Sequence, residues 1–266
     1  MKHYMPHTQQ LSYWYTLDKN PENPLGGGSL HEYYRHMHND YELFLFKGGS
    51  VNYHVENTTY SLQAGNLLII KPMVYHGIEI MSPDPYERYV FNFSKLLLTQ
   101  AQADILSKAD VLYQLKDGHP IELLFESMHI CKEVLSEGEL QQHLHATLNA
   151  LIKLLAQEKG DRVRKTKGKL DEIIEYIQEH LEQPLDSDML AKQFFVSKSW
   201  IDHSFKKHLG SSPKQYINHK KVLYAQSLIL SGMPATQVAE RCGYKNYTTF
   251  YRQYKQYLGH EPHSDC

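Results

Sequence analysis

The sequence predicts a two-domain protein: an all-β N-terminal barrel followed by a helical segment, and an all-α C-terminal domain. Apolar residues recur with the period of strands up to about residue 95 and with the period of helices beyond it. A polar, basic stretch then separates the two regions, and 266 residues suffice for two domains. We predict a barrel at 1–95, a helical dimerisation segment at 96–159, a linker at 160–168 and a helical domain at 169–266.

The composition excludes several classes of protein. Hydrophobic residues make up 41% of the chain and charged residues 22%, which is typical of folded domains and not of disorder. No apolar stretch approaches the ~18 residues of a membrane span, and the first residues lack a signal core. The three cysteines have neither metal-binding spacing nor the even count of a disulfide framework. We expect a cytoplasmic protein with no membrane partner.

Charge is distributed unevenly along the chain. Residues 1–161 carry 12 Lys/Arg against 19 Asp/Glu, whereas residues 162–266 carry 16 against 11, so a net charge of −2 divides into −7 and +5. A basic C-terminal part favours contact with a polyanion there, although a solvated basic face explains charge alone equally well.

Strands are predicted in the first part by alternation. Val51, Tyr53 and Val55 alternate with polar residues, a turn is expected at Asn57–Thr58, and the alternation then resumes, which is a hairpin pattern. The apolar run 67–70 is typical of a strand buried on both faces. Many short strands with Gly and Pro between them favour a barrel or sandwich.

Two amphipathic helices are predicted between residues 121 and 155. Their apolar positions follow helical spacing: Ile121, Leu124, Met128, Cys131 and Leu135 in one, and Leu140, Leu144, Leu148, Leu151 and Leu155 in the other. The tight connection at Ser136–Gly138 predicts that they are antiparallel. Their stripes suit either a dimer interface or packing onto the chain's own barrel.

The C-terminal region contains a degenerate duplication. Phe205-Lys-Lys-His-Leu-Gly-Ser-Ser-Pro213 recurs at an offset of 49 residues as Tyr254-Lys-Gln-Tyr-Leu-Gly-His-Glu-Pro262. In each copy a short helix (187–194 and 235–241) precedes a second helix (197–208 and 246–257), which predicts a helix-turn-helix pair. Gly243 suits the second turn, whereas the first turn has Phe195 and no glycine.

A helix predicted from Pro213 to Leu230 connects the two copies. Its 18 or so residues give a rod of roughly 27 Å. With the flanking turns, the rod could hold two recognition helices about one duplex turn (~34 Å) apart on one face of DNA. The duplication, this separation and the positive charge together favour double-stranded DNA as the partner over a purely structural helical array.

Residues 168–262 resemble the DNA-binding domain of AraC-family transcription regulators. The resemblance is carried by Leu190-Ala191, Phe205-Lys206-Lys207, Gly210-x-x-Pro213-x-x-Tyr216, the helix through Ala225 and Leu230, Val238-Ala239, Cys242-Gly243-Tyr244, Phe250 to Lys255, and Gly259-x-x-Pro262. It implies that the second helix of each copy enters the major groove. It also implies transcription activation through RNA polymerase, although the sequence itself does not separate activation from repression.

Helix faces predict which side chains read DNA. Ile201, Phe205, Leu209, Phe250 and Tyr254 form the buried stripes. The outward candidates are Ser199, Trp200, Asp202, His203 and Lys206 in the first recognition helix, and Asn246, Tyr247, Thr248, Thr249, Arg252 and Lys255 in the second. Arg252 suits a bidentate contact to guanine, and Lys206 and Lys255 suit phosphates.

The N-terminal part contains a second motif, His36-x-His38-x3-Glu42-x6-Gly49, followed by Gly65 and His76. Residues 36, 38 and 42 have the same parity, so on one strand they would point to one side. This pattern resembles the two motifs of the cupin barrel. The second motif departs from that family at three positions, where Lys71 replaces a proline, Met73 a glycine and Ile80 an asparagine.

The four side chains His36, His38, Glu42 and His76 have two interpretations. They suit a divalent Fe, Mn, Ni or Zn site, or they line a polar pocket that binds a small effector directly, with no cofactor required. AraC-family regulators often have such a barrel as their sensor, which implies a sugar-like effector. The expected function is therefore an effector-controlled, homodimeric DNA-binding regulator and not an enzyme.

Two other functions stay open at this point. One is a cupin metalloenzyme with an accessory helical domain, which bound metal with turnover would support. The other is a DNA-binding protein with no effector, which a filled barrel would support. Phosphate-binding loops, nucleophile elbows and zinc-protease helices are absent from the sequence.

Overall fold

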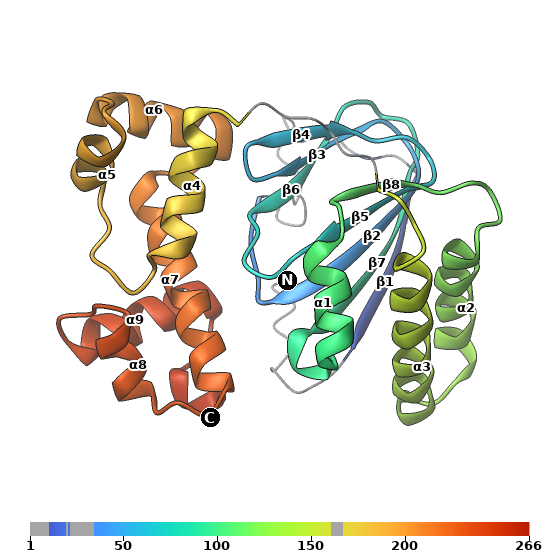
Figure 1. Cartoon of the computed structure of the whole chain (residues 1–266). Coiled ribbons are helices and arrows are strands. Elements are labelled where there is room, and N and C mark those ends of the chain that lie inside the picture. Colours follow the sequence, from blue (N-terminus) through green and yellow to red (C-terminus); the bar gives the residue numbers. More distant parts are fainter. Residues whose placement is uncertain (1–10, 20, 22–34, 161–166, 266) are drawn as a thin grey trace. The chain divides into compact units, whose positions relative to one another are not determined.

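The computed structural model describes residues 11–19, 21, 35–160 and 167–265. The chain divides into two compact units, one ending at residue 164 and the other beginning at residue 165 (Figure 1). Most of the predicted linker, 161–166, lies outside the described residues. No helix in the described part of the chain is long and apolar enough to cross a bilayer.

The N-terminal unit is built on two antiparallel sheets. The larger has the strand order β1-β7-β2-β5-β8 and the smaller β4-β3-β6 (Figure 1). The strands are β1 Ser12–Asp18, β2 Asp40–Gly48, β3 Val51–Val55, β4 Thr58–Ser61, β5 Asn66–Ile70, β6 His76–Ile80, β7 Tyr86–Ser94 and β8 Leu112–Gln114. The predicted hairpin is confirmed as β3 and β4, but its turn is at Glu56–Asn57, because Thr58 already belongs to β4.

The predicted β-rich N-terminal domain is confirmed, but its described strands do not close into a barrel. The described strands form two separate sheets, and no ladder among them joins β1 or β8 to β4 or β6. Alternation in the sequence shows which face of a strand is buried but not which edges pair. One apolar core, including Phe44, Phe46, Tyr53 and Leu68, packs between the sheets.

The helices after β7 are η3 Lys95–Leu97, α1 Gln100–Lys108, α2 Pro120–Val134 and α3 Glu137–Leu155. The predicted apolar stripes of α2 and α3 pack onto the chain's own sheet, where Met128 and Leu148 join one core with Leu43 and Phe91. Packing onto the chain's own sheet, one of the two predicted alternatives, is therefore confirmed. A further correction is β8, a strand inside the segment predicted as helical, which pairs with β5 at the edge of the larger sheet.

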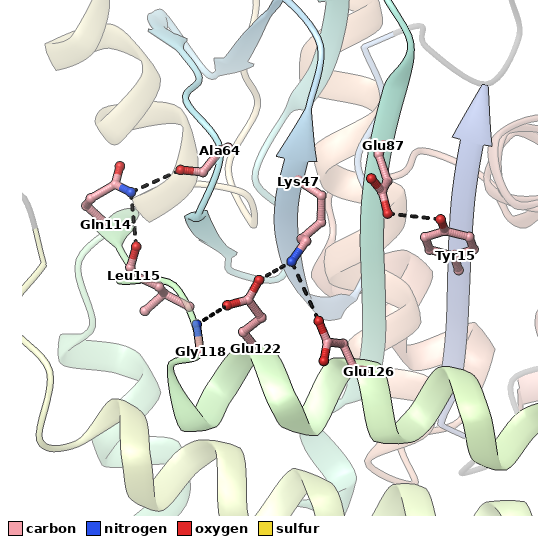
Figure 2. A network of polar contacts seen from close by, with 9 residues as sticks. All are labelled: Tyr15, Lys47, Ala64, Glu87, Gln114, Leu115, Gly118, Glu122 and Glu126. Atoms are coloured by element: carbon pink, nitrogen blue, oxygen red, sulfur yellow. Dashed lines mark hydrogen bonds and ion pairs between the residues drawn. The ribbon is translucent and has the colours of Figure 1, made fainter. Parts of the chain in front are cut away.

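A polar network fastens α2 to the end of β2 (Figure 2). Lys47 Nζ donates to Glu122 and lies 3.7 Å from Glu126 Oε1. The other oxygen of Glu122 accepts from the Gly118 N–H at 2.9 Å. Burial alone would lower the pKa of Lys47, but the hydrogen bond and charge of Glu122 outweigh it and raise that pKa. The first turn of α2 is therefore held to the sheet by charge as well as by apolar packing.

The C-terminal unit is helical, and its helices agree closely with the sequence prediction. They are α4 Lys169–Glu179, α5 Ser187–Phe194, α6 Lys198–Leu209, α7 Pro213–Leu230, α8 Ala235–Arg241, α9 Tyr247–Leu258 and η4 Pro262–Asp265. Side-chain caps explain the starts: Asp186, Ser197, Ser212 and Asn246 each accept from a backbone N–H of the first turn. The first helix of the unit, α4, ends at Glu179, before Pro184.

Candidate ligand site and nucleic-acid interface

The four candidate ligands of the N-terminal unit do meet in space. One ligand atom from each of His36, His38, Glu42 and His76 lies within 4.8 Å of the others. The reason predicted for it is wrong, however, because β2 begins at Asp40 and only Glu42 is on that strand. His36 and His38 belong to the segment before β2, so strand parity does not bring them together.

Backbone pairing places this segment against β6. The N–H of His36 donates to the carbonyl of His76 at 2.7 Å, and the N–H of His76 donates back at 2.8 Å. Met73 N–H donates to the His38 carbonyl at 2.7 Å. Gly77 permits the approach, because a Cβ there would lie 2.7 Å from Arg35 Cα. Backbone hydrogen bonds between the segment of His36 and His38 and the residues from Met73 to His76 thus position the histidines near Glu42.

Hydrogen bonds outside the cluster orient its side chains. The ring nitrogen Nδ1 of His38 lies 3.0 Å from the Asp40 carbonyl, and that of His76 lies 2.8 Å from the Val74 carbonyl. A carbonyl only accepts, so each Nδ1 carries the proton and each Nε2 faces inward, 3.4 Å and 3.7 Å from Glu42 Oε2. This arrangement is the usual support of histidine ligands in metal sites.

The contact of Tyr53 with this cluster was not predicted from the sequence. It is buried at the centre of β3, and its hydroxyl donates to Glu42 Oε1 at 2.9 Å. This bond leaves Oε2 for the histidines. The signal in the sequence is parity: Tyr53 alternates with polar residues in the predicted hairpin, so its side chain belongs to the buried face. A buried tyrosine hydroxyl usually has a partner.

The electrostatics of the cluster favour a carboxylate beside a cation. Burial alone would raise the pKa of Glu42, but hydrogen bonds and charge from His38 and His76 hold that pKa well below its usual value. Burial would likewise lower the pKa of His38, and the contact with Glu42 raises it instead. Three imidazoles and one carboxylate are also a donor set that fits divalent Zn, Fe, Mn or Ni.

The three departures from the cupin motif have defined positions in the structure. Met73 occupies the glycine position and adopts the left-handed region, with φ 63°. Lys71 donates to the carbonyl of Ser107 at 2.6 Å, and Ile80 pairs with Val51 in the smaller sheet. The loop before His76 therefore contains a methionine with strained backbone.

This strain predicts an order of stabilities. The Met73→Gly variant should be more stable than Met73→Ala by about 1 kcal/mol, because both lose the side chain but only glycine tolerates positive φ. Urea unfolding followed by Trp14 fluorescence measures the difference. At Ser61, in the extended strand β4, alanine should be the more stable of the same two replacements. Equal stabilities at position 73 would contradict the strain.

The C-terminal unit presents two recognition helices, α6 and α9. The predicted inward residues Ile201, Phe205, Leu209, Phe250 and Tyr254 are all fully buried. The predicted outward residues Ser199, Trp200, Asp202, His203, Lys206, Tyr247, Thr248, Arg252 and Lys255 are exposed, and Thr249 is partly buried. The helix faces assigned from the sequence are therefore correct.

Three of the predicted readers have other contacts. Asn246 caps α9 instead of lying within it, and its side chain accepts from the Thr249 N–H at 2.8 Å. Asp202 accepts from the Ser187 hydroxyl at 3.3 Å, which gives this acid a partner within the unit. Lys255 donates to Glu261 at 3.2 Å. Arg252, Thr248 and His203 are exposed on the outward faces of the two helices.

Both units match known families. Residues 26–165 match the AraC-like ligand binding domain, and residues 190–264 match a helix-turn-helix domain. The chain belongs to the AraC family. The matched families describe ligand binding and DNA binding, and the relatives are transcriptional regulators, so the metalloenzyme interpretation is not retained.

Individual relatives of this AraC-family chain share parts of it. The multiple antibiotic resistance protein MarA of Escherichia coli is 35% identical over 92 residues, which are 34% of this chain and 72% of MarA. LumQ of Photobacterium leiognathi is 29% identical over 136 residues, 49% of this chain and 53% of LumQ. GbdR of Pseudomonas aeruginosa strain PAO1 is 32% identical over 98 residues, 36% of this chain and 27% of GbdR. This chain therefore spans about half of LumQ and a smaller part of GbdR. Among solved structures, ToxT from Vibrio cholerae O395 has a TM-score of 0.40 at 13% identity, with 96% of each chain covered.

Proposed function

We propose that this AraC-family protein is a sequence-specific DNA-binding transcription regulator controlled by a small molecule in its N-terminal unit. The observation that carries the proposal is the pair of helix-turn-helix units, which the 18-residue helix α7 connects and whose outward faces carry polar, basic and aromatic side chains. A helix of that length spans roughly 27 Å, which suits two contacts about one duplex turn apart.

Retention of genomic DNA tests the regulator. Purified protein is incubated with sheared genomic DNA at moderate salt, and the retained fragments are sequenced. Recovery of a few sites, each with two short blocks about one helical turn (10–10.5 bp) apart, supports the proposal. Weak, sequence-independent retention that disappears with salt, with and without candidate effectors, counts against it.

Two substitutions, one in α9 and one in α6, distinguish a residue that reads bases from a residue that contacts phosphates. Arg252→Ala should cost about 1–3 kcal/mol on a recovered site and relax the preference at one base pair. Lys206→Ala should weaken binding evenly on specific and random duplexes and reduce the salt slope by ~0.9. Both constants come from fluorescence anisotropy at several salt concentrations. Equal losses of Arg252→Ala on specific and random DNA would remove its role as a base reader.

We propose that the effector binds at the cluster of His36, His38, Glu42 and His76, where a divalent metal ion would provide coordination positions for its oxygen atoms. The donor set and the two inward Nε2 atoms support this. A sugar is the proposed class of effector, since its hydroxyls suit such a site and the partly buried Trp14 lies at the edge of the apolar core between the sheets. Thermal shifts with a sugar panel, with and without metal, measure the effect.

We propose a homodimer through the outer face of α2. Leu123, Ile130 and Val134 are 53%, 63% and 72% exposed. Their spacing places them on one stripe, opposite the buried Ile121 and Met128. An exposed apolar stripe of this kind is typical of an interaction surface, and a second copy would cover it symmetrically.

The stripe on α2 predicts a change in oligomeric state. Ile130→Glu should weaken dimerisation by about tenfold or more, because it places a charge at the centre of an apolar contact. Sedimentation velocity over a range of concentrations measures it. Lys132→Glu adds acidic charge at an exposed polar position of the same helix and should leave the dimer unchanged. A wild-type protein that stays monomeric at high concentration would rule out this interface.

Activation through RNA polymerase is the proposed consequence of DNA binding. It is supported by the family to which the chain belongs. In vitro transcription from a recovered site with purified RNA polymerase measures the direction of regulation. Increased transcription on addition of protein and effector supports activation, and decreased transcription reverses the sign.

A further inference from the structure

The turn between α5 and α6 contains an unusual residue. Phe195 adopts the left-handed conformation, with φ 55° and ψ 43°, and its side chain is 95% exposed. Left-handed backbone is unfavourable for a residue with a Cβ. Because the phenyl ring is exposed to water, it does not contribute the stabilising free energy that a buried ring provides. Within the folded unit, Phe195 is thus unfavourable in two ways.

The internal duplication provides a matched comparison for this residue. In the first unit, Val196 N–H donates to the Ala191 carbonyl at 3.1 Å; in the second, Tyr244 N–H donates to the Ala239 carbonyl at 3.0 Å. Phe195 therefore corresponds to Gly243, which has φ 76°. The two turns share one backbone conformation, and only the second has the residue that suits it.

Packing inside the first unit does not explain the phenylalanine. The preceding residue, Phe194, is partly buried and packs edge-on against Tyr176, with ring centroids 5.4 Å apart. The inward position at this turn is therefore already filled by an aromatic ring. Strained, exposed residues of this kind are found where a partner compensates for the cost.

The position of Phe195 favours DNA as that partner, because the turn directly precedes the recognition helix α6. Residues 189–201 contain Lys192 and Lys198, and Asp188 and Asp202 lie directly on either side of this segment. Lys198 is paired with Asp188 at 2.7 Å, whereas Lys192 is exposed one turn before Phe195. The second unit has Glu240 at the position of Lys192. The first turn thus has an exposed apolar ring next to one exposed lysine, Lys192, and it leads directly into the recognition helix α6.

We propose that Phe195 contacts apolar carbons of DNA, either thymine methyl groups or deoxyribose, at the edge of the groove that α6 enters. The contact rests on the proposed DNA-binding function and makes the two helix-turn-helix units unequal: the first adds an apolar contact from its turn, and the second does not. An apolar contact releases no counterions, so it strengthens binding without changing its salt dependence.

Replacing Phe195 tests this contact, because the same substitution should raise the stability of the protein and weaken its binding to DNA. The full chain is used with a fluorescein-labelled duplex that contains a site recovered from genomic DNA. Phe195→Gly reproduces the turn of the second unit, and Phe195→Asn keeps a side chain that tolerates left-handed backbone. Both variants should unfold about 4 °C higher than the wild type. Both should also bind the site about tenfold more weakly, with an unchanged salt slope.

Other results overturn the proposal. A raised unfolding temperature with unchanged affinity places Phe195 outside the DNA interface. If those variants also fail to activate transcription with purified RNA polymerase, the partner of Phe195 is a protein. A smaller salt slope in the variants means that the ring supports a phosphate contact instead of making an apolar one. Failure of the wild-type protein to prefer any sequence removes the regulator itself, and that result is distinct from failure of the variants alone.

Discussion

Replacing Lys221 with methionine is expected to destabilise the C-terminal unit by about 3 kcal/mol and to abolish specific DNA binding. Lys221 lies in the middle of α7 and is only 8% exposed. Its ammonium group donates to the carbonyl of Gln183 at 2.7 Å and to that of Cys242 at 3.1 Å. Methionine has a similar length but no donor, so both carbonyls would lose their charged partner.

These two carbonyls belong to different parts of the unit. Gln183 follows α4 and precedes the first helix-turn-helix, whereas Cys242 ends α8 in the second. The ammonium group therefore ties both halves to the connecting helix, and its loss should disturb the spacing of α6 and α9. Burial lowers the pKa of Lys221, which is the expected cost of placing a charge there.

Urea unfolding followed by Trp200 fluorescence measures the effect, since the chain's two tryptophans lie in different units. Lys214→Met is the matched control, because Lys214 lies on the same helix and is exposed. It should change the free energy of unfolding by less than about 0.5 kcal/mol. A loss for Lys221→Met no larger than that of the control would show that the carbonyls do not depend on this lysine.

The C-terminal unit could be predicted almost completely from the sequence because its signals are local. Caps such as Ser197 and Asn246 and the apolar period fix where each helix begins and which face is buried. Lys221 could not be predicted, because in sequence it is one basic residue in a helix. Its role depends on carbonyls 38 and 21 residues away.

The N-terminal unit was harder to predict, because its structure depends on pairing between segments that are distant in the sequence. The four donors of the cluster could be identified by residue type, but the parity argument failed because His36 reaches the cluster through a backbone bridge to His76. Such a pairing between distant segments leaves no periodic signal. The same limit explains why the open edges of the two sheets and the strand β8 were not predicted.

Metal binding at the cluster should depend strongly on His76. Wild-type protein freed of metal with EDTA is expected to bind Zn²⁺ or Ni²⁺ in isothermal titration calorimetry and to unfold at a higher temperature with either ion. His76→Ala should weaken this binding by more than about 100-fold, beyond the ~10–100-fold effect of residues outside the ligand set. His54→Ala is the control, since His54 lies in the same sheet but pairs with Glu79 and Thr59.

A glycine variant then separates the donors from the backbone that brings them together. Gly77→Ala keeps all four donors but places a Cβ against the backbone of Arg35, so the segment with His36 and His38 must shift. Affinity for Zn²⁺ should fall by about tenfold, whereas Gly48→Ala, with no atom within 4 Å of the added Cβ, should leave it unchanged. If His76→Ala lowers the affinity for Zn²⁺ but Gly77→Ala does not, the ion itself would order the segment with His36 and His38. If neither variant changes metal binding, the ion binds elsewhere, and the four side chains line a pocket that contacts the effector directly.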